Sequence, residues 1–120
     1  MIEITDETMR ANLATVRLYG LLLLKKGPTY LPPEQRSAAH KAIIWEHGRR
    51  NMALRAEGRM PLVGPLGRGG DVVGLCVFDV PEAEIHTLMK DDPAVAAGLF
   101  TYEIADWFAF PGDCLPREKA

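Results

Sequence analysis

The sequence lacks a strong excess of charge of one sign and a long apolar run. Its 14 basic and 16 acidic residues leave a formal net charge of -2, which gives no broad basic field for nucleic acid or an anionic membrane. The longest aliphatic run, Leu21–Leu24, is far too short to span a bilayer, and the N-terminus is polar and acidic. We therefore expect a soluble, cytoplasmic protein that binds neither nucleic acid nor membranes.

Cysteine is also scarce, with only two residues in the chain. Cys76 lies inside an apolar segment, where it is expected to be a small core residue, and Cys114 lies in a tail rich in proline and glycine. These settings do not suggest a disulfide, in agreement with a reducing compartment. With 120 residues and 48% apolar residues, one domain can fold without disulfides or metal. We expect a single domain, 1–120, composed of a helical extension at 1–16, a core at 17–110 and a tail at 111–120.

Three helical segments are expected. Thr5 can cap a first helix that runs to about Val16, since acidic residues then occupy its first turn near the positive end of the helix dipole. Pro32–Pro33 opens the longest helix, which continues to about Gly58. A third helix is expected at Pro81–Lys90, followed by a short helical turn.

The expected strands differ in their apolar pattern. Arg17–Leu24 and Val72–Phe78 are apolar at both parities, which is typical of strands buried on both faces. Met60–Leu66 contains two prolines and Leu99–Phe108 alternates, and both patterns are typical of sheet edges. A β-α-β-β-α-β order with right-handed crossovers predicts a ferredoxin-like α+β fold with an extra N-terminal helix. Its spatial strand order, 4-1-3-2, places the two apolar strands at the centre.

Helices on one face only would leave the other face of this apolar sheet uncovered, so a face-to-face homodimer is expected. The longest helix also carries a second apolar surface with Trp45 and Met52, which the N-terminal helix or another subunit would have to cover. Trp107, Phe108 and Phe110, near the end of the last strand, are expected to fill a dimer interface or to line a cavity.

Two separated residues offer the most specific chemistry in the chain. Helical phase places His47 on the inward side of its helix with Ile43 and Leu54, and Asp92 directly precedes Pro93. A carboxylate that meets an imidazole fixes its tautomer and equips it to move a proton. However, an inward histidine is often a core residue bonded to backbone, and an aspartate before proline often only stops a helix. The spacing alone leaves both interpretations open.

Six short segments form a combined pattern with this histidine. They are Ala56–Arg59, Leu62–Pro65, Gly74–Val80, Asp91–Pro93, Ala97–Phe100 and Ala105–Phe108. Together they make the region from Arg17 to Phe110 resemble the YCII-related family. The resemblance implies the dimeric α/β-barrel form of the ferredoxin-like fold and an active-site pair, here His47 and Asp92. It also implies that the few members of known chemistry act by elimination on small ring metabolites. The extension before Arg17 departs from the shortest members.

The residues and the resemblance together predict a small-molecule enzyme of the lyase or isomerase type that transfers a proton without a cofactor. His47 and Asp92 are the expected catalytic pair. Gly64, Pro65 and Arg59 are expected to contact the substrate, although the first two can equally mark a strand end and single arginines near turns are usually solvated. The alternatives are a non-catalytic dimer that binds a small molecule and a purely structural dimer.

Nucleotide and metal sites are not expected. Gly67–Gly70 lacks the Lys-Ser/Thr ending of a phosphate-binding loop and precedes a strand, so it predicts a hairpin turn. His40 and His47 share a helical face, but their separation of about 10 Å along the axis is too large for one ion to bridge easily. His86 adds no closer partner in the sequence.

Overall fold

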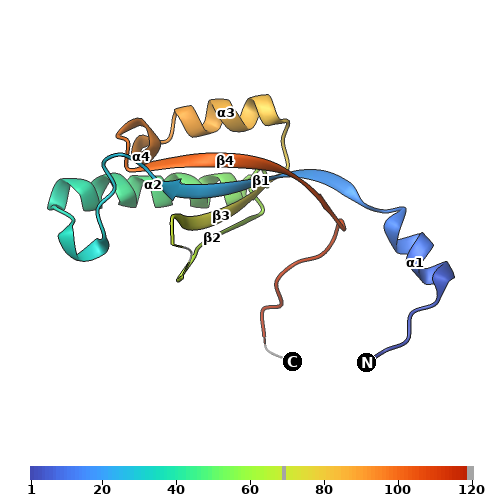
Figure 1. Ribbon diagram of the computed structural model, residues 1–120. Helices are drawn as coiled ribbons and strands as arrows, with labels where there is room; N and C mark the ends of the chain where they lie inside the picture. Colours follow the sequence, from blue (N-terminus) through green and yellow to red (C-terminus); the bar gives the residue numbers. More distant parts are fainter. Residues whose placement is uncertain (69, 119–120) are drawn as a thin grey trace.

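The computed structural model describes residues 1–68 and 70–118 and contains one sheet with helices (Figure 1). The elements follow each other as α1 (Asp6–Leu13), β1 (Arg17–Lys26), η1 (Pro33–Gln35), α2 (Ala38–Ala56), β2 (Leu62–Pro65), β3 (Val72–Phe78), α3 (Glu82–Lys90), α4 (Pro93–Ala96) and β4 (Phe100–Ala109). The strands form a 4-stranded sheet in the order β2-β3-β1-β4. All neighbouring strands are antiparallel. The expected ferredoxin-like order is confirmed, as are its central and edge strands.

The alternation of side chains along the central strands places the core on one face of the sheet. Leu22 and Leu24 of β1 are buried together with Phe78 of β3, and this cluster includes Leu54 of α2 and Ile85 of α3. Both long helices therefore pack on the same face. Since side chains alternate along a strand, the residues between these positions point to the opposite face.

That opposite face is largely apolar and carries neither long helix. Leu21 pairs with Val77 of β3 and Ala105 of β4, and Leu23 pairs with Leu75 of β3. We call these five residues and Leu62, which pairs with Val77 from β2, the open sheet face. An apolar sheet face of this kind normally packs against another layer.

Helix α2 begins later than the sequence predicted. Pro33–Gln35 forms a separate 3-10 turn, and Arg36 and Ser37 are extended. The Ser37 hydroxyl caps α2 by accepting a hydrogen bond from the His40 amide at 3.2 Å. A serine cap competes well with a proline start, because its side chain satisfies an amide that the helix leaves without a partner. The prediction of a start at Pro32–Pro33 is therefore wrong.

The first helix forms an arm instead of a cover. Thr5 caps α1 as expected, with its hydroxyl accepting from the Thr8 amide at 3.1 Å, but the helix ends at Leu13 rather than near Val16. None of its residues is buried, and it extends beyond one end of the sheet (Figure 1). Trp45 and Met52 remain 70% and 52% exposed. The expectation that this helix covers them is wrong for the single chain, because α1 projects away from α2.

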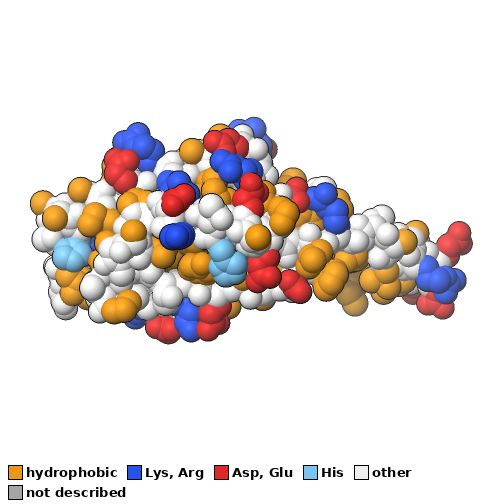
Figure 2. All heavy atoms as spheres, turned by 90° about the horizontal axis from the view of Figure 1, so that it is seen from above, with side chains coloured by type: hydrophobic (Ala, Val, Ile, Leu, Met, Phe, Trp, Pro, Cys, Tyr) orange, Lys and Arg blue, Asp and Glu red, His pale blue; other side chains and the backbone are white. Residues whose placement is uncertain are grey.

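The arm makes the molecule elongated. The radius of gyration is 17.0 Å, whereas a compact domain of this length has about 14 Å. Seen from above, the body narrows toward the end of the arm, which carries side chains of both charges (Figure 2).

The expected Gly67–Gly70 turn includes Gly69, which lies outside the described residues. Among the helices of the described segments, none combines the length and apolar character needed to cross a bilayer.

Candidate active site

The structure brings the two separated residues of the sequence analysis into direct contact. His47 lies on the inward side of α2, and its Nδ1 atom is 2.7 Å from Oδ2 of Asp92. The side chains are only 12% and 3% exposed. The predicted inward direction of His47 and its meeting with Asp92 are therefore confirmed.

Asp92 is held by the start of α4. Its second oxygen, Oδ1, accepts hydrogen bonds from the backbone amides of Ala94 at 2.8 Å and Val95 at 3.3 Å. It thus caps this short helix, whose Pro93 occupies the first position. Asp92 therefore caps a helix and also contacts the histidine, because each interaction uses a different oxygen of its carboxylate.

The ionisation of Asp92 decides which atom of the pair carries the proton. Burial raises the pKa of this carboxyl, but the hydrogen bond and the charge of His47, together with the amides of Ala94 and Val95, outweigh burial and lower the pKa below its ordinary value. Asp92 is therefore ionised at neutral pH and can only accept hydrogen bonds. The proton lies on His47 Nδ1, which donates to Asp92.

With Nδ1 protonated, the neutral His47 ring carries its lone pair on Nε2. The side-chain nitrogen of Asn51 lies 3.2 Å from this atom and donates to it. Asn51 is one helical turn after His47, so it occupies the same face of α2. Sequence reasoning did not select Asn51; its i+4 spacing from the histidine is the signal that identifies it.

The His47 ring lies in the wall of a cavity of about 470 Å³. Gly64 and Pro65 also line this cavity, as does Asn51, so two of the residues expected at the substrate share a cavity with His47. Arg59 is not among its described lining residues; its Nε donates to Glu57 at 2.8 Å. The apolar part of the wall includes Leu24, Ile44, Val63 and Phe100.

Cys76 also lines the cavity but has little nucleophilic character. Burial raises the pKa of its thiol to about 12, with the charge of Asp92 adding to the effect. The thiol therefore stays protonated at neutral pH. Its expected role as a small core residue is confirmed, since Cys76 belongs to the buried core.

The other two histidines are occupied elsewhere. His40 Nδ1 lies 2.7 Å from the hydroxyl of Ser37, and His86 Nδ1 lies 2.8 Å from the hydroxyl of Tyr102. Within residues 1–68 and 70–118, no three His, Cys, Asp or Glu side chains are grouped closely enough to hold a metal ion.

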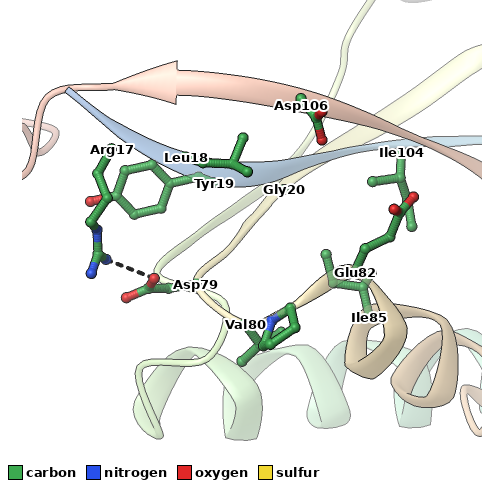
Figure 3. Close-up of a pocket in the computed structure, with 11 residues that line it drawn as sticks. Arg17, Leu18, Tyr19, Gly20, Asp79, Val80, Glu82, Ile85, Ile104 and Asp106 are labelled. Carbon is green, nitrogen blue, oxygen red and sulfur yellow. Dashed lines mark hydrogen bonds and ion pairs between the residues drawn. The ribbon is translucent and has the colours of Figure 1, made fainter.

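A second hollow of about 300 Å³ lies where the start of β1 faces the start of α3 (Figure 3). Its walls include Arg17, Asp79, Glu82 and Asp106. Arg17 donates to Asp79 at 2.7 Å, but both side chains are more than 40% exposed, so the pair is strongly screened by water. None of its described lining residues is a histidine or a cysteine, and its three acids outnumber its one base, which pairs with Asp79.

The Asp92 carboxylate should make stability depend on pH. Because its pKa is lower in the folded protein than in the unfolded chain, ionised Asp92 stabilises the fold above about pH 4, and this contribution is lost as the pH falls through the folded value. Asp92→Asn keeps a good helix cap but removes the charge. We expect the difference in unfolding free energy between the parent protein and Asp92→Asn to shrink below pH 4 in urea titrations.

The exposed neighbour Asp91 provides a matched control, and Asp91→Asn should leave the unfolding free energy within about 0.5 kcal/mol of the parent value. A difference between the parent protein and Asp92→Asn that stays constant from pH 7 to pH 3 would contradict this account of the carboxylate.

Comparison with solved structures relates this geometry to known proteins. The chain is similar to a crystal structure of muconolactone isomerase, with 17% identity, a TM-score of 0.56 and coverage of 86% of this chain and 100% of that chain. It also matches a 5-chloro-2-hydroxyhydroquinone dehydrochlorinase from Burkholderia phenoliruptrix AC1100 in complex with 2,5-dihydroxybenzoquinone. There the identity is 21%, the TM-score 0.46 and the coverage 76% of this chain and 93% of that chain. The first likeness shows a shared fold.

The sequence comparisons give the family. No protein of curated function matches the chain significantly. The model of the YCII-related domain matches residues 20–108, which include β2, β3, most of β1 and β4, and both His47 and Asp92. Because this match covers well over half of the chain, the protein belongs to the YCII-related domain family.

Proposed function

We propose that the protein is a small-molecule enzyme of the lyase or isomerase type, in which His47 transfers a proton and Asp92 orients it. The single observation that carries this proposal is the 2.7 Å contact between Oδ2 of Asp92 and Nδ1 of His47, whose ring lines a cavity. The sharing of a fold with a muconolactone isomerase is consistent with this class of reaction.

In this mechanism the Nε2 atom of His47 removes a proton from a carbon or hydroxyl group of the bound substrate. The imidazolium that forms keeps its Nδ1–H directed at the ionised Asp92, which stabilises the new positive charge. Asp92 itself stays in place because the amides of Ala94 and Val95 hold its other oxygen. His47 then returns the proton to another atom of the substrate in an isomerisation, or to the leaving group in an elimination.

Asn51 forms a hydrogen bond with the nitrogen of His47 that acts as the base. Its amide donates to Nε2 at 3.2 Å, so the lone pair that would accept the substrate proton already accepts a hydrogen bond. A bound substrate must displace this long hydrogen bond. The cost is modest, because a neutral hydrogen bond contributes only about 1 kcal/mol net.

We also propose that two copies pair through the open sheet face. Within the described segments, neither α2 nor α3 packs on the apolar residues of this face, such as Leu21 and Leu75. Burying them between two chains would give each sheet its missing layer. The exposed arm, whose residues are all accessible, is available for contacts with a partner.

Removal of the imidazole should abolish proton transfer. We expect His47→Ala to lower the rate at least about 100-fold, the usual contribution of a general base, while leaving the fold intact. The assay is deuterium incorporation from D₂O into muconolactone and a panel of ring-bearing carboxylic acids, followed by ¹H NMR. In the parent protein the pH–rate profile should follow the titration of His47 measured on its own imidazole resonances.

His86→Ala is the matched control, because His86 is exposed and lies outside the cavity; it should leave exchange unchanged. Exchange that persists in His47→Ala would disprove the assignment of the base. Saturable binding without exchange for every compound that binds would favour the alternative of a non-catalytic binding protein.

A charge on the open sheet face should separate the two copies. Leu21→Asp would place a carboxylate in the centre of an apolar interface, where its burial without a partner is strongly unfavourable, so sedimentation velocity should change from dimer to monomer. The control Ala83→Asp lies on an exposed position of α3 and should sediment like the parent protein. A parent protein that is monomeric at micromolar concentration would refute the dimer.

A further inference from the structure

We propose that the ligand of the His47 cavity combines a flat apolar ring with one anionic group, and that Arg36 binds the anion. The inference rests on the proposed function in that it places the ligand in the same cavity, but it concerns recognition and not turnover. It assigns a role to a residue that neither the spacing of motifs nor the histidine pair indicated.

The charge of the cavity wall favours an anionic ligand. Arg36 is the permanently charged side chain among the described lining residues, and no carboxylate is found among them. Asp92 lies behind His47, 2% exposed, and does not line the cavity. In a wall that is otherwise mostly apolar, a guanidinium attracts an anion more strongly than it would in water. It would also repel a cationic ligand.

Arg36 is fixed in position without being neutralised. Its Nε donates to the carbonyl of Leu31 at 2.8 Å, and its guanidinium carbon lies 5.4 Å from the centre of the Tyr30 ring. Among the ion pairs of the described segments, none involves Arg36. Its terminal nitrogens thus remain available, and a guanidinium matches a carboxylate with two parallel hydrogen bonds.

The late start of α2 produces this placement. Because Ser37 caps the helix and Arg36 has extended dihedrals, with φ of -77° and ψ of 131°, Arg36 lies just before the first turn instead of within it. The 3-10 turn at Pro33–Gln35 precedes it, and Pro33 also lines the cavity. The local structure that differs from the sequence prediction is therefore the one that positions the cation.

An aromatic wall connects Arg36 with the proton-transfer pair. The ring centres of Tyr30 and Phe100 are 6.2 Å apart, and those of Phe100 and His47 are 5.1 Å apart. Both aromatic residues line the cavity. A flat ring stacks favourably on such side chains. A ligand that lies along this wall would have its anionic group at Arg36 and a reacting atom near Nε2 of His47.

A neighbouring hollow adds to the positive field. It shares Arg36, Ile44, Gly48 and Met52 with the cavity and adds Lys41 and Arg49. Arg49 donates to Glu46 at 3.2 Å, so Arg36 and Lys41 supply most of the positive charge of this hollow. Cations beside a binding cavity raise the local concentration of an anionic ligand.

Benzoate and its neutral isostere benzamide test the inference directly, because they share the ring and differ in charge. We expect NMR titration of the full chain to show that benzoate binds at least about tenfold more tightly than benzamide, the effect of one charge-assisted pair. Arg36→Gln should remove this preference and leave benzamide affinity unchanged, whereas Arg36→Lys should retain part of it. The control Arg55→Gln removes the same charge from an exposed position of α2 and should keep the preference.

Equal affinities of benzoate and benzamide for the parent protein, or binding of neither compound, would overturn the inference. So would a benzoate preference that survives Arg36→Gln in a variant whose thermal unfolding is unchanged. His47→Ala separates the two proposals: it should abolish deuterium exchange but keep the benzoate preference. If the preference is present and exchange is absent in the parent protein, only the proposed reaction fails.

Discussion

The Asp92 carboxylate is the constraint on which the arrangement of the site depends. One oxygen accepts hydrogen bonds from two backbone amides at the start of α4, and the other accepts a hydrogen bond from Nδ1 of His47 in α2. A single buried group therefore joins the longest helix to the segment that leads into β4. Because its burial is compensated by three hydrogen bonds, it stays ionised and fixes which nitrogen of the histidine is protonated.

The site and the proposed dimer contact lie on opposite faces of the sheet. On the helix-covered face, α2 carries His47 and Asn51 into the cavity wall, and Phe100 of β4 lines the same cavity. The start of α4 holds Asp92 against His47. The open sheet face lies on the other side, where we propose that the second copy packs. The chemistry can thus remain within one chain while association uses a different surface.

The sequence predicted the features that follow from periodicity. Alternation and proline content predicted the central and edge strands, and helical phase predicted that His47 lies on the inward side of its helix. The start of α2 could not be obtained in this way, because Pro33 and Ser37 are both good helix-start residues and only the packed loop selects between them. The position of Arg36 depends on that same loop. Arg59 looked available in the sequence, but its neighbour Glu57 occupies it.

The protonation of the His47 ring is the most direct test of the central claim. Nitrogen-15 NMR of labelled protein, recorded at a pH where the ring is neutral, distinguishes a protonated ring nitrogen from one that carries a lone pair. The account predicts that Nδ1 is protonated and Nε2 is not, and that this preference weakens in Asp92→Asn. A ring protonated mainly on Nε2 in the parent protein would contradict it, because Asp92 would then not be the group that orients the base.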